Sequence, residues 1–207
     1  RGRPDLKLVM GLVFVLGTFG MNFQITMALM ATKVFGKGPT EFGALGSLMG
    51  IGALGAALLS AARSRARLRF ILGAMAGYVV FQGASGLVGE FWQFAALQVP
   101  IGLCAITTVV TANTLLQTSV AGAVRGRVMA LWMVFLLGAT PVVGPLVGWI
   151  GTTFGPRWTV QVGTIAIFAT FVVVTWYLMA HKGVRMRLQW SATRPIVVYY
   201  VPGDVQT

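Results

Sequence analysis

Acidic residues are nearly absent from this chain. Its 207 residues include four Asp or Glu, and charged residues of both signs make up only 10% of the total. A soluble domain has about 25% charged residues, so an ordinary water-facing surface is excluded. Hydrophobic residues make up 57%, which is more apolar surface than a soluble core can bury. The composition predicts an integral membrane protein whose apolar side chains are surrounded by lipid.

Cysteine is scarcer still. The single Cys104 lies inside an apolar stretch, and one cysteine supports neither a disulfide framework nor a thiolate metal site. The net charge of +12 comes from basic residues that do not gather on one amphipathic face, as nucleic-acid binding would require. We therefore expect no cofactor, no metal and no nucleic-acid partner, and we expect membrane lipid to be the surrounding medium.

Charge is absent from six long apolar runs. Each run is long enough to cross a ~30 Å hydrocarbon core as a helix. The runs are continuous and do not alternate apolar with polar residues, which excludes a transmembrane β-barrel. We expect an all-α membrane protein whose residues 1–182 form a bundle of six transmembrane helices, at about residues 8–31, 43–62, 70–88, 94–118, 128–151 and 158–180.

A basic tail follows the sixth run. Residues 183–207 are expected to be loosely ordered, with residues 197–200 able to make only a brief strand. Most of the 16 Lys and Arg residues lie before the first run, in alternate connections and in this tail. By the positive-inside rule, both termini are expected in the cytoplasm of a multi-pass cell-membrane protein.

Polar residues recur with helical spacing inside two of the runs. They include Thr18, Asn22 and Thr26 in the first run, at every fourth position and hence on one face. Polar groups at membrane depth are costly unless they face the bundle interior or water. We expect a substrate cavity lined by these three residues and by Thr107, Thr111, Asn113, Thr114 and Gln117 of the fourth run. The alternative is that the hydroxyls bond to their own helix and the amides hold helices together.

The fifth run is rich in glycine and proline. Pro141, Gly144, Pro145 and Gly148 predict a kinked helix that packs closely on its neighbours, because proline disrupts a helix and glycine allows close approach. The same small-residue spacing recurs at Gly46/Gly50 and Gly73/Gly77.

A basic segment, Arg125-Gly126-Arg127, precedes the fifth run and is expected to be a cytoplasmic turn. Two compatible interpretations stay open. The arginines anchor this end in the cytoplasm, or they pair with carboxylates or helix C-termini and stabilise one conformation.

Around this segment, residues 120–131 (VAGAVRGRVMAL) resemble the major facilitator superfamily, in particular its drug and siderophore exporter branch. Asn113 and the pair Leu116-Gln117, residues 19–23 (FGMNF) and residues 144–148 (GPLVG) resemble the same branch. The resemblance covers about residues 1–182. It implies the C-terminal half of a twelve-helix fold, built from two inverted three-helix repeats.

The resemblance also implies a function. The chain would export an amphipathic, drug-like or siderophore-like small molecule by alternating access. A missing N-terminal six-helix half, from the same chain or a second copy, would complete the cavity between the halves. No acidic residue lies inside the runs, so a coupling carboxylate is expected in that other half.

Two other classes compete with a transporter. Residues 83–86 (GASG) and His181 resemble the motifs of rhomboid intramembrane serine proteases. Ser85 is expected at the outer membrane face and His181 at the inner one, too far apart for catalysis. We therefore expect the chain not to be an enzyme. A non-transporting scaffold subunit is the other alternative, but it would explain neither the polar stripes nor the interrupted fifth run.

Overall fold

The computed structural model describes residues 11, 14–20, 22–62, 68–137, 140–182, 185–191 and 194–200. Helices dominate this part of the chain, as the apolar runs predict. In chain order the elements are η1 (Leu16–Gly20), α2 (Phe23–Leu29), η2 (Met30–Val34), α3 (Pro39–Ala61), α4 (Leu68–Ser85), α5 (Phe91–Ser119), α6 (Gly122–Leu137), α7 (Thr140–Thr153), α8 (Pro156–Lys182), β1 (Arg185–Ser191) and β2 (Arg194–Tyr200).

Four helices among the described residues, α3, α4, α5 and α8, are long and apolar enough to cross a membrane. They fall on the second, third, fourth and sixth predicted runs. The first run, residues 8–31, is not one regular α-helix where the structure describes it. The fifth run, residues 128–151, which was expected to be kinked, is described as two helices, one on each side of the undescribed residues 138–139. The first run forms two π-helical segments around the short α2, and the fifth forms α6 and α7. Six membrane crossings remain a prediction.

Glycine and proline define where the long helices begin. Gly36 has φ of +60° and Gly155 has φ of +101°, a left-handed conformation that glycine adopts without steric cost. Pro39 and Pro156 then occupy the first positions of α3 and α8, where a missing N–H costs nothing. The Glu41 side chain accepts a hydrogen bond of 3.1 Å from the Gly38 N–H, which satisfies a free donor at the start of α3.

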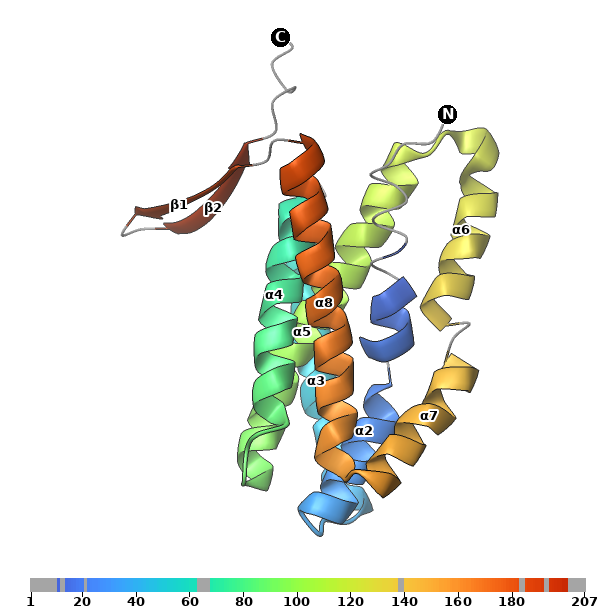
Figure 1. Ribbon diagram of the computed structural model, residues 1–207, viewed down its shortest axis with the longest axis vertical. Coiled ribbons are helices and arrows are strands. Elements are labelled where there is room, and N and C mark those ends of the chain that lie inside the picture. Colours follow the sequence, from blue (N-terminus) through green and yellow to red (C-terminus); the bar gives the residue numbers. More distant parts are fainter. Residues whose placement is uncertain are drawn as a thin grey trace.

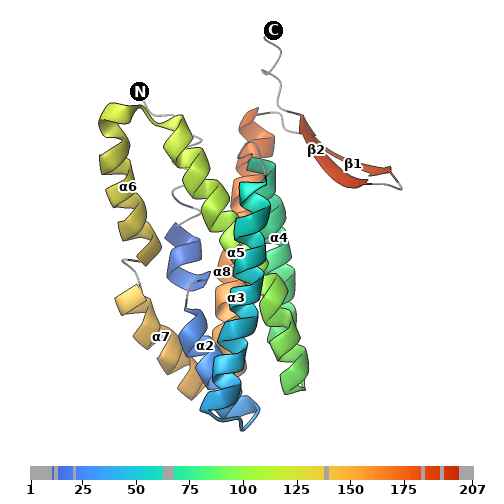
Figure 2. The same cartoon turned by 180° about the vertical axis from the view of Figure 1, so that it is seen from behind.

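Helix α5 packs against both α3 and α4, and α8 packs against α4 and α7 (Figures 1 and 2). At the α3–α5 crossing, Gly52 lies against the backbone of Val99, and Gly102 lies against the backbone of Met49. The predicted glycine motifs are only partly used. Nothing lies within 4 Å of where a Cβ would stand on Gly46, Gly50 or Gly73, whereas on Gly77 it would lie 2.9 Å from Cys104 Sγ.

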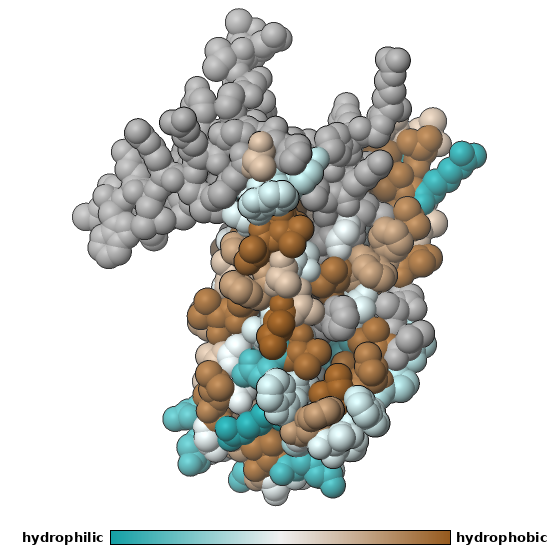
Figure 3. Space-filling view, viewed as in Figure 1, coloured by the Kyte–Doolittle hydropathy of each residue, from teal (hydrophilic) through white to brown (hydrophobic). Residues whose placement is uncertain are grey.

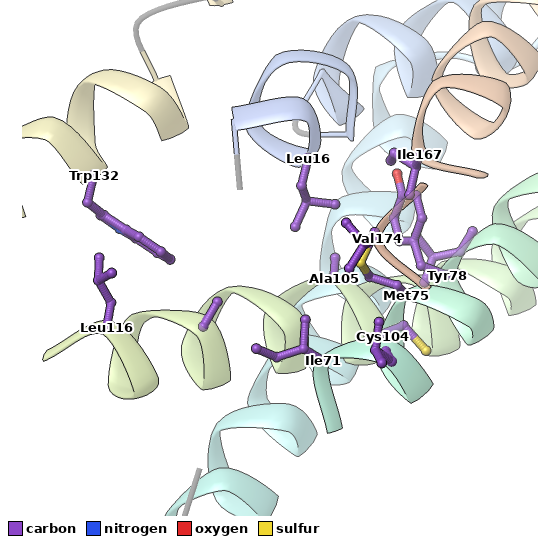
Figure 4. Close-up of a cluster of buried hydrophobic side chains, with 13 residues drawn as sticks. Leu16, Ile71, Met75, Tyr78, Cys104, Ala105, Leu116, Trp132, Ile167 and Val174 are labelled. Carbon is purple, nitrogen blue, oxygen red and sulfur yellow. The ribbon is translucent and has the colours of Figure 1, made fainter. Parts of the chain in front are cut away.

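A buried apolar cluster joins five elements of the bundle: η1, α4, α5, α6 and α8. Figure 4 shows Leu16 of η1 pointing toward side chains of α4, α5 and α8. The cluster also includes Met75, Tyr78, Ala105 and Ile167, and each of these side chains is at most 2% exposed. Because lipid tails are as apolar as these side chains, the cluster is stabilised by close van der Waals packing rather than by removal from water. The cluster fixes how the first run sits against the long helices.

The connections divide between two ends of the bundle. In Figure 1 the α5–α6 connection and the end of α8 lie at the upper end, and the η2–α3, α4–α5 and α7–α8 connections lie at the lower end. Apolar side chains cover much of the face in Figure 3, and hydrophilic ones gather at its lower end. This distribution suits a bundle whose middle is surrounded by lipid.

The tail differs from its prediction. Among the described residues, β1 and β2 pair antiparallel, from Arg185 opposite Tyr200 to Ser191 opposite Arg194. The expectation of a loosely ordered tail is therefore wrong for residues 185–191 and 194–200. Residues 196–200 are β-branched or aromatic, which favours an extended conformation, and the partner strand supplies the hydrogen bonds that a lone strand would lack.

Candidate functional site

The polar residues of the first run surround a helix interruption. Helix η1 ends at Gly20 and α2 begins at Phe23. Between them Asn22 has φ of −84° and ψ of 32°, outside the helical range. Thr18, Asn22 and Thr26 are 5%, 6% and 8% exposed, so all three are buried within the protein.

Asn22 is hydrogen-bonded in an unusual way for its position. It precedes α2, where an Asn side-chain oxygen commonly accepts a bond from the helix N–H groups, yet no such cap forms. Its Nδ2 instead donates to the Thr18 carbonyl at 2.7 Å. The Asn22 Oδ1 and the Thr18 Oγ1 are buried without a hydrogen-bond partner. Such atoms cost about 1–3 kcal/mol each.

The polar residues of the fourth run do not share one environment. Thr107 and Thr111 on α5 are each 6% exposed, Asn113 is half-buried, and Thr114 and Gln117 are exposed. Gln117 Nε2 donates to Asn113 Oδ1 at 2.6 Å, and the Thr114 hydroxyl donates to the Val110 carbonyl at 2.9 Å. Bonding within the helix thus accounts for Thr114. It does not account for Thr107, whose buried Oγ1 has no partner.

The first run turns different faces to α5 and to α7. Leu16 belongs to the apolar cluster with Ala105 and Ala112 of α5. Thr18 is two positions further on, and residues two apart on a helix do not share a face. Asn22 faces α7, since a Cβ built on Gly144 would lie 4.0 Å from Asn22 Oδ1 and 3.3 Å from Ile25 Cδ1.

The Gly/Pro-rich stretch of the fifth run lies in α7. Pro141 follows Thr140, the first residue of α7, and Pro145 lies inside this helix. Gly144 lies against α2, as described above, whereas nothing is within 4 Å of where a Cβ on Gly148 would stand. Only one of these two glycines is therefore used for close helix packing.

The basic segment is helical. Arg125, Gly126 and Arg127 lie in the first turns of α6, which begins at Gly122, and all three are exposed. The prediction of a turn at these residues is wrong. The break between α5 and α6 lies earlier, at Val120, whose φ of −107° and ψ of 134° are extended. Arginine is a good helix former, so Arg125 and Arg127 are accommodated within α6.

One set of contacts was not predicted. Gln161 Nε2 of α8 donates to the Gly83 carbonyl at 3.3 Å, and Arg157 Nη2 donates to the Val88 carbonyl at 3.1 Å. These bonds join the start of α8 to the end of α4 and the connection that follows it. The sequence does show the Gln161 amide within an apolar run. Its partner, Gly83, lies 78 residues away along the chain, so spacing could not identify it.

The serine-protease motif does not assemble. Ser85 ends α4 beside the second turn of α8, where Gln161 lies, and its Oγ donates to the Gln82 carbonyl at 2.7 Å. His181 lies in the last turn of the 27-residue α8, a helix about 40 Å long. Ser85 and His181 are therefore far beyond hydrogen-bond reach. Among the described residues, no group of three His, Cys, Asp or Glu is placed to hold a metal.

Comparison with known families gives one match. A family model described as Major Facilitator Superfamily matches residues 9–196. The matched region contains η1, α2, η2, α6, α7 and the four long apolar helices. No curated protein and no solved structure matches the chain.

Proposed function

The chain belongs to the major facilitator superfamily, a family of membrane transporters, and we propose that it carries a small amphipathic solute across the cell membrane by alternating access. The exporter-like residues 120–131 favour efflux of a drug-like or siderophore-like molecule. In this proposal the chain is a multi-pass protein with six crossings, built as two inverted three-helix repeats. Both termini face the cytoplasm, in accordance with the distribution of Lys and Arg.

The single observation that carries the proposal is a set of unpaired oxygens within the apolar bundle. Thr18 Oγ1, Asn22 Oδ1 and Thr107 Oγ1 are buried and lack a hydrogen-bond partner. Apolar residues of the same size would avoid this cost, as isosteric replacement of polar groups commonly does. A solute pathway would explain why these oxygens are retained, because a passing solute or its water supplies the missing hydrogen-bond partners.

The proposed transporter is completed by a second six-helix half. In this family architecture the solute path lies between two halves, and we propose that the present chain is the C-terminal one. The exposed Thr114 and Gln117, with the half-buried Asn113, are then available to line the path. Either the same polypeptide or a second copy supplies the other half, and it also supplies any coupling carboxylate.

A flux measurement tests the proposal. The native protein is reconstituted in lipid vesicles, and the efflux of a fluorescent amphipathic dye is compared for wild type, Thr107→Val and Thr108→Val. Thr108 is the matched control, since it is the next residue, is fully buried and has its hydroxyl bonded to the Cys104 carbonyl at 2.9 Å. We expect Thr107→Val to slow flux about threefold to tenfold, the effect of one hydrogen bond. Absence of flux in the wild type would contradict transport, and equal flux in all three would remove Thr107 from the path.

A further inference from the structure

The C-terminal hairpin of β1 and β2 has two chemically different faces. In an antiparallel pair, directly opposite residues lie on the same face, and successive residues alternate between the faces. The register of the two strands assigns one face six apolar or aromatic positions: Met186, Leu188, Trp190, Pro195, Val197 and Tyr199. The other face has the positions of all three arginines, Arg185, Arg187 and Arg194, with two polar positions on β1 and three apolar or aromatic ones on β2.

The hairpin stands apart from the helices. Within the described part of the chain, each strand makes its main contacts with the other strand, and no helix contacts either one more than slightly. Figures 1 and 2 show the hairpin extending sideways from the end of α8, away from the other helices. A two-stranded hairpin is at best marginally stable in water unless its apolar face packs on another surface. We therefore expect a further apolar surface against this face.

Two exposed tryptophans on α8 have the spacing of the two membrane faces. Trp158 and Trp176 are 52% and 64% exposed, and they lie on the same side of α8, because eighteen residues make five full helical turns. Exposed residues between them include Ile165, Phe168 and Val172, and none of the intervening residues is charged. Eighteen residues span about 27 Å of helix, close to the ~30 Å hydrocarbon core. Tryptophan is enriched at both edges of that core.

The hairpin consequently begins near the lipid headgroups. Helix α8 ends at Lys182, which is six residues or about 9 Å beyond Trp176, and β1 begins three residues later at Arg185. With its headgroups a bilayer is about 40–45 Å thick, so α8 ends close to the headgroup layer. The apolar surface nearest to the hairpin is thus the lipid itself.

The charge of the hairpin also suits a lipid surface. Its three arginines are its only charged residues, and basic residues beside a membrane are attracted to anionic phospholipids. Tryptophan and tyrosine, which the hairpin contains at Trp190, Tyr199 and Tyr200, are the aromatic residues enriched at the membrane interface. Interfacial amphipathic helices combine an apolar face with a basic one in the same way.

We propose that the hairpin lies along the membrane surface where α8 ends, with its apolar face among the lipid chains and its arginines at the level of anionic phospholipid headgroups. The partner of this surface is the phospholipid bilayer. The inference goes beyond the proposed transport function and does not depend on it, because it concerns only how the C-terminal segment is held at the membrane.

Spin labels on the two faces of the hairpin test the inference. Val197 and Val198 are adjacent residues of the same type, and the register places Val197 on the apolar face and Val198 on the basic one. Val197→Cys and Val198→Cys are made in the native protein after replacement of its other cysteines. Each is labelled and reconstituted in vesicles of phosphatidylcholine and phosphatidylglycerol. We expect the label at 197 to collide mainly with oxygen, which dissolves in lipid, and the label at 198 mainly with a water-soluble nickel chelate.

Removal of the arginines tests the headgroup contact. Each arginine near an anionic surface contributes ~1 kcal/mol, or about fivefold. The combined variant Arg185→Gln, Arg187→Gln and Arg194→Gln is therefore expected to lower the ratio of lipid-bound to free hairpin about a hundredfold, measured with the label at position 197. The control is Arg125→Gln combined with Arg127→Gln. It removes exposed charge from α6 at the same end of the bundle and is expected to leave the ratio unchanged.

Three results would overturn the inference. Equal access of the nickel chelate to both labels would mean that the hairpin stands in water. Shielding of both labels from both reagents would mean that a protein surface covers it. A difference between the labels that the arginine variant does not reduce would remove the anionic headgroups from the contact. Dye flux is measured separately, so each of these results would leave the proposed transport function standing.

Discussion

Gly17 of η1 lies directly against the backbone of Leu136, the penultimate residue of α6, with no room for a side chain between them. This contact holds η1 of the first run against the end of α6 of the fifth run. Phe14 and Phe135 pack edge to face beside it, with ring centroids 5.5 Å apart. The two segments therefore form one packed pair rather than two independent helices.

Gly17→Ala is expected to separate this pair. A Cβ at this position would meet backbone atoms of Leu136, which cannot rotate away as a side chain could. We expect the free energy of unfolding to fall by about 1–3 kcal/mol, as in other overpacked sites. Chemical unfolding in detergent measures the change. Gly148→Ala is the control, because nothing lies within 4 Å of its Cβ position. It should be neutral or slightly stabilising, and a loss at Gly148 as large as at Gly17 would contradict the packing.

Gly52→Ala tests the crossing of α3 and α5 in the same way. Its Cβ would meet the Val99 carbonyl, whereas nothing lies within 4 Å of a Cβ on Gly50, two residues earlier and on a different face of the same helix. We expect Gly52→Ala to lower the unfolding temperature and Gly50→Ala to leave it unchanged or raise it. Equal effects of the two substitutions would mean that α3 turns another face to α5.

Gln161→Leu is expected to weaken the junction between α8 and the end of α4. It removes the hydrogen bond to the Gly83 carbonyl, and the free energy of unfolding should fall by roughly 1 kcal/mol. Gln93→Leu serves as the control, since Gln93 is exposed on α5. Hydrogen exchange at residues 83–88 gives a local measurement. Unchanged exchange in Gln161→Leu would show that the junction does not depend on this side chain.

The sequence predicts most of the helices because hydropathy is a local property. Residues 70–88 and 94–118 were recognised from apolar length alone, and α4 and α5 begin and end within three residues of them. The interruption at Asn22 was not predicted. Asn22 lies in the same four-residue repeat as Thr18 and Thr26, so the pattern indicated a continuous polar face. Whether an asparagine lines a helix or interrupts it depends on neighbours that lie far along the chain.

The glycines and threonines show the same limit. Gly46 and Gly50 have the spacing of a packing motif, yet Gly52 makes the close contact. The direction in which a helix face points is set by its partner helix, and spacing within one run does not contain that information. Likewise, Thr107 and Thr114 lie seven residues apart on the same predicted stripe. Thr107 is buried without a partner, and Thr114 is exposed and bonded to its own helix.

Cysteine labelling at position 107 tests the central claim most directly, that buried unpaired oxygens line a solute path. Cys104 is the only cysteine of these 207 residues. Cys104→Ala, together with replacement of any cysteine in the second half, gives a thiol-free background in which Thr107→Cys and Thr108→Cys are compared. A small water-soluble thiol reagent is applied to the native protein in vesicles, with and without transported dye. The account predicts labelling at position 107 that dye slows, and little labelling at position 108. Equal labelling of the two positions, or none at 107, would contradict it.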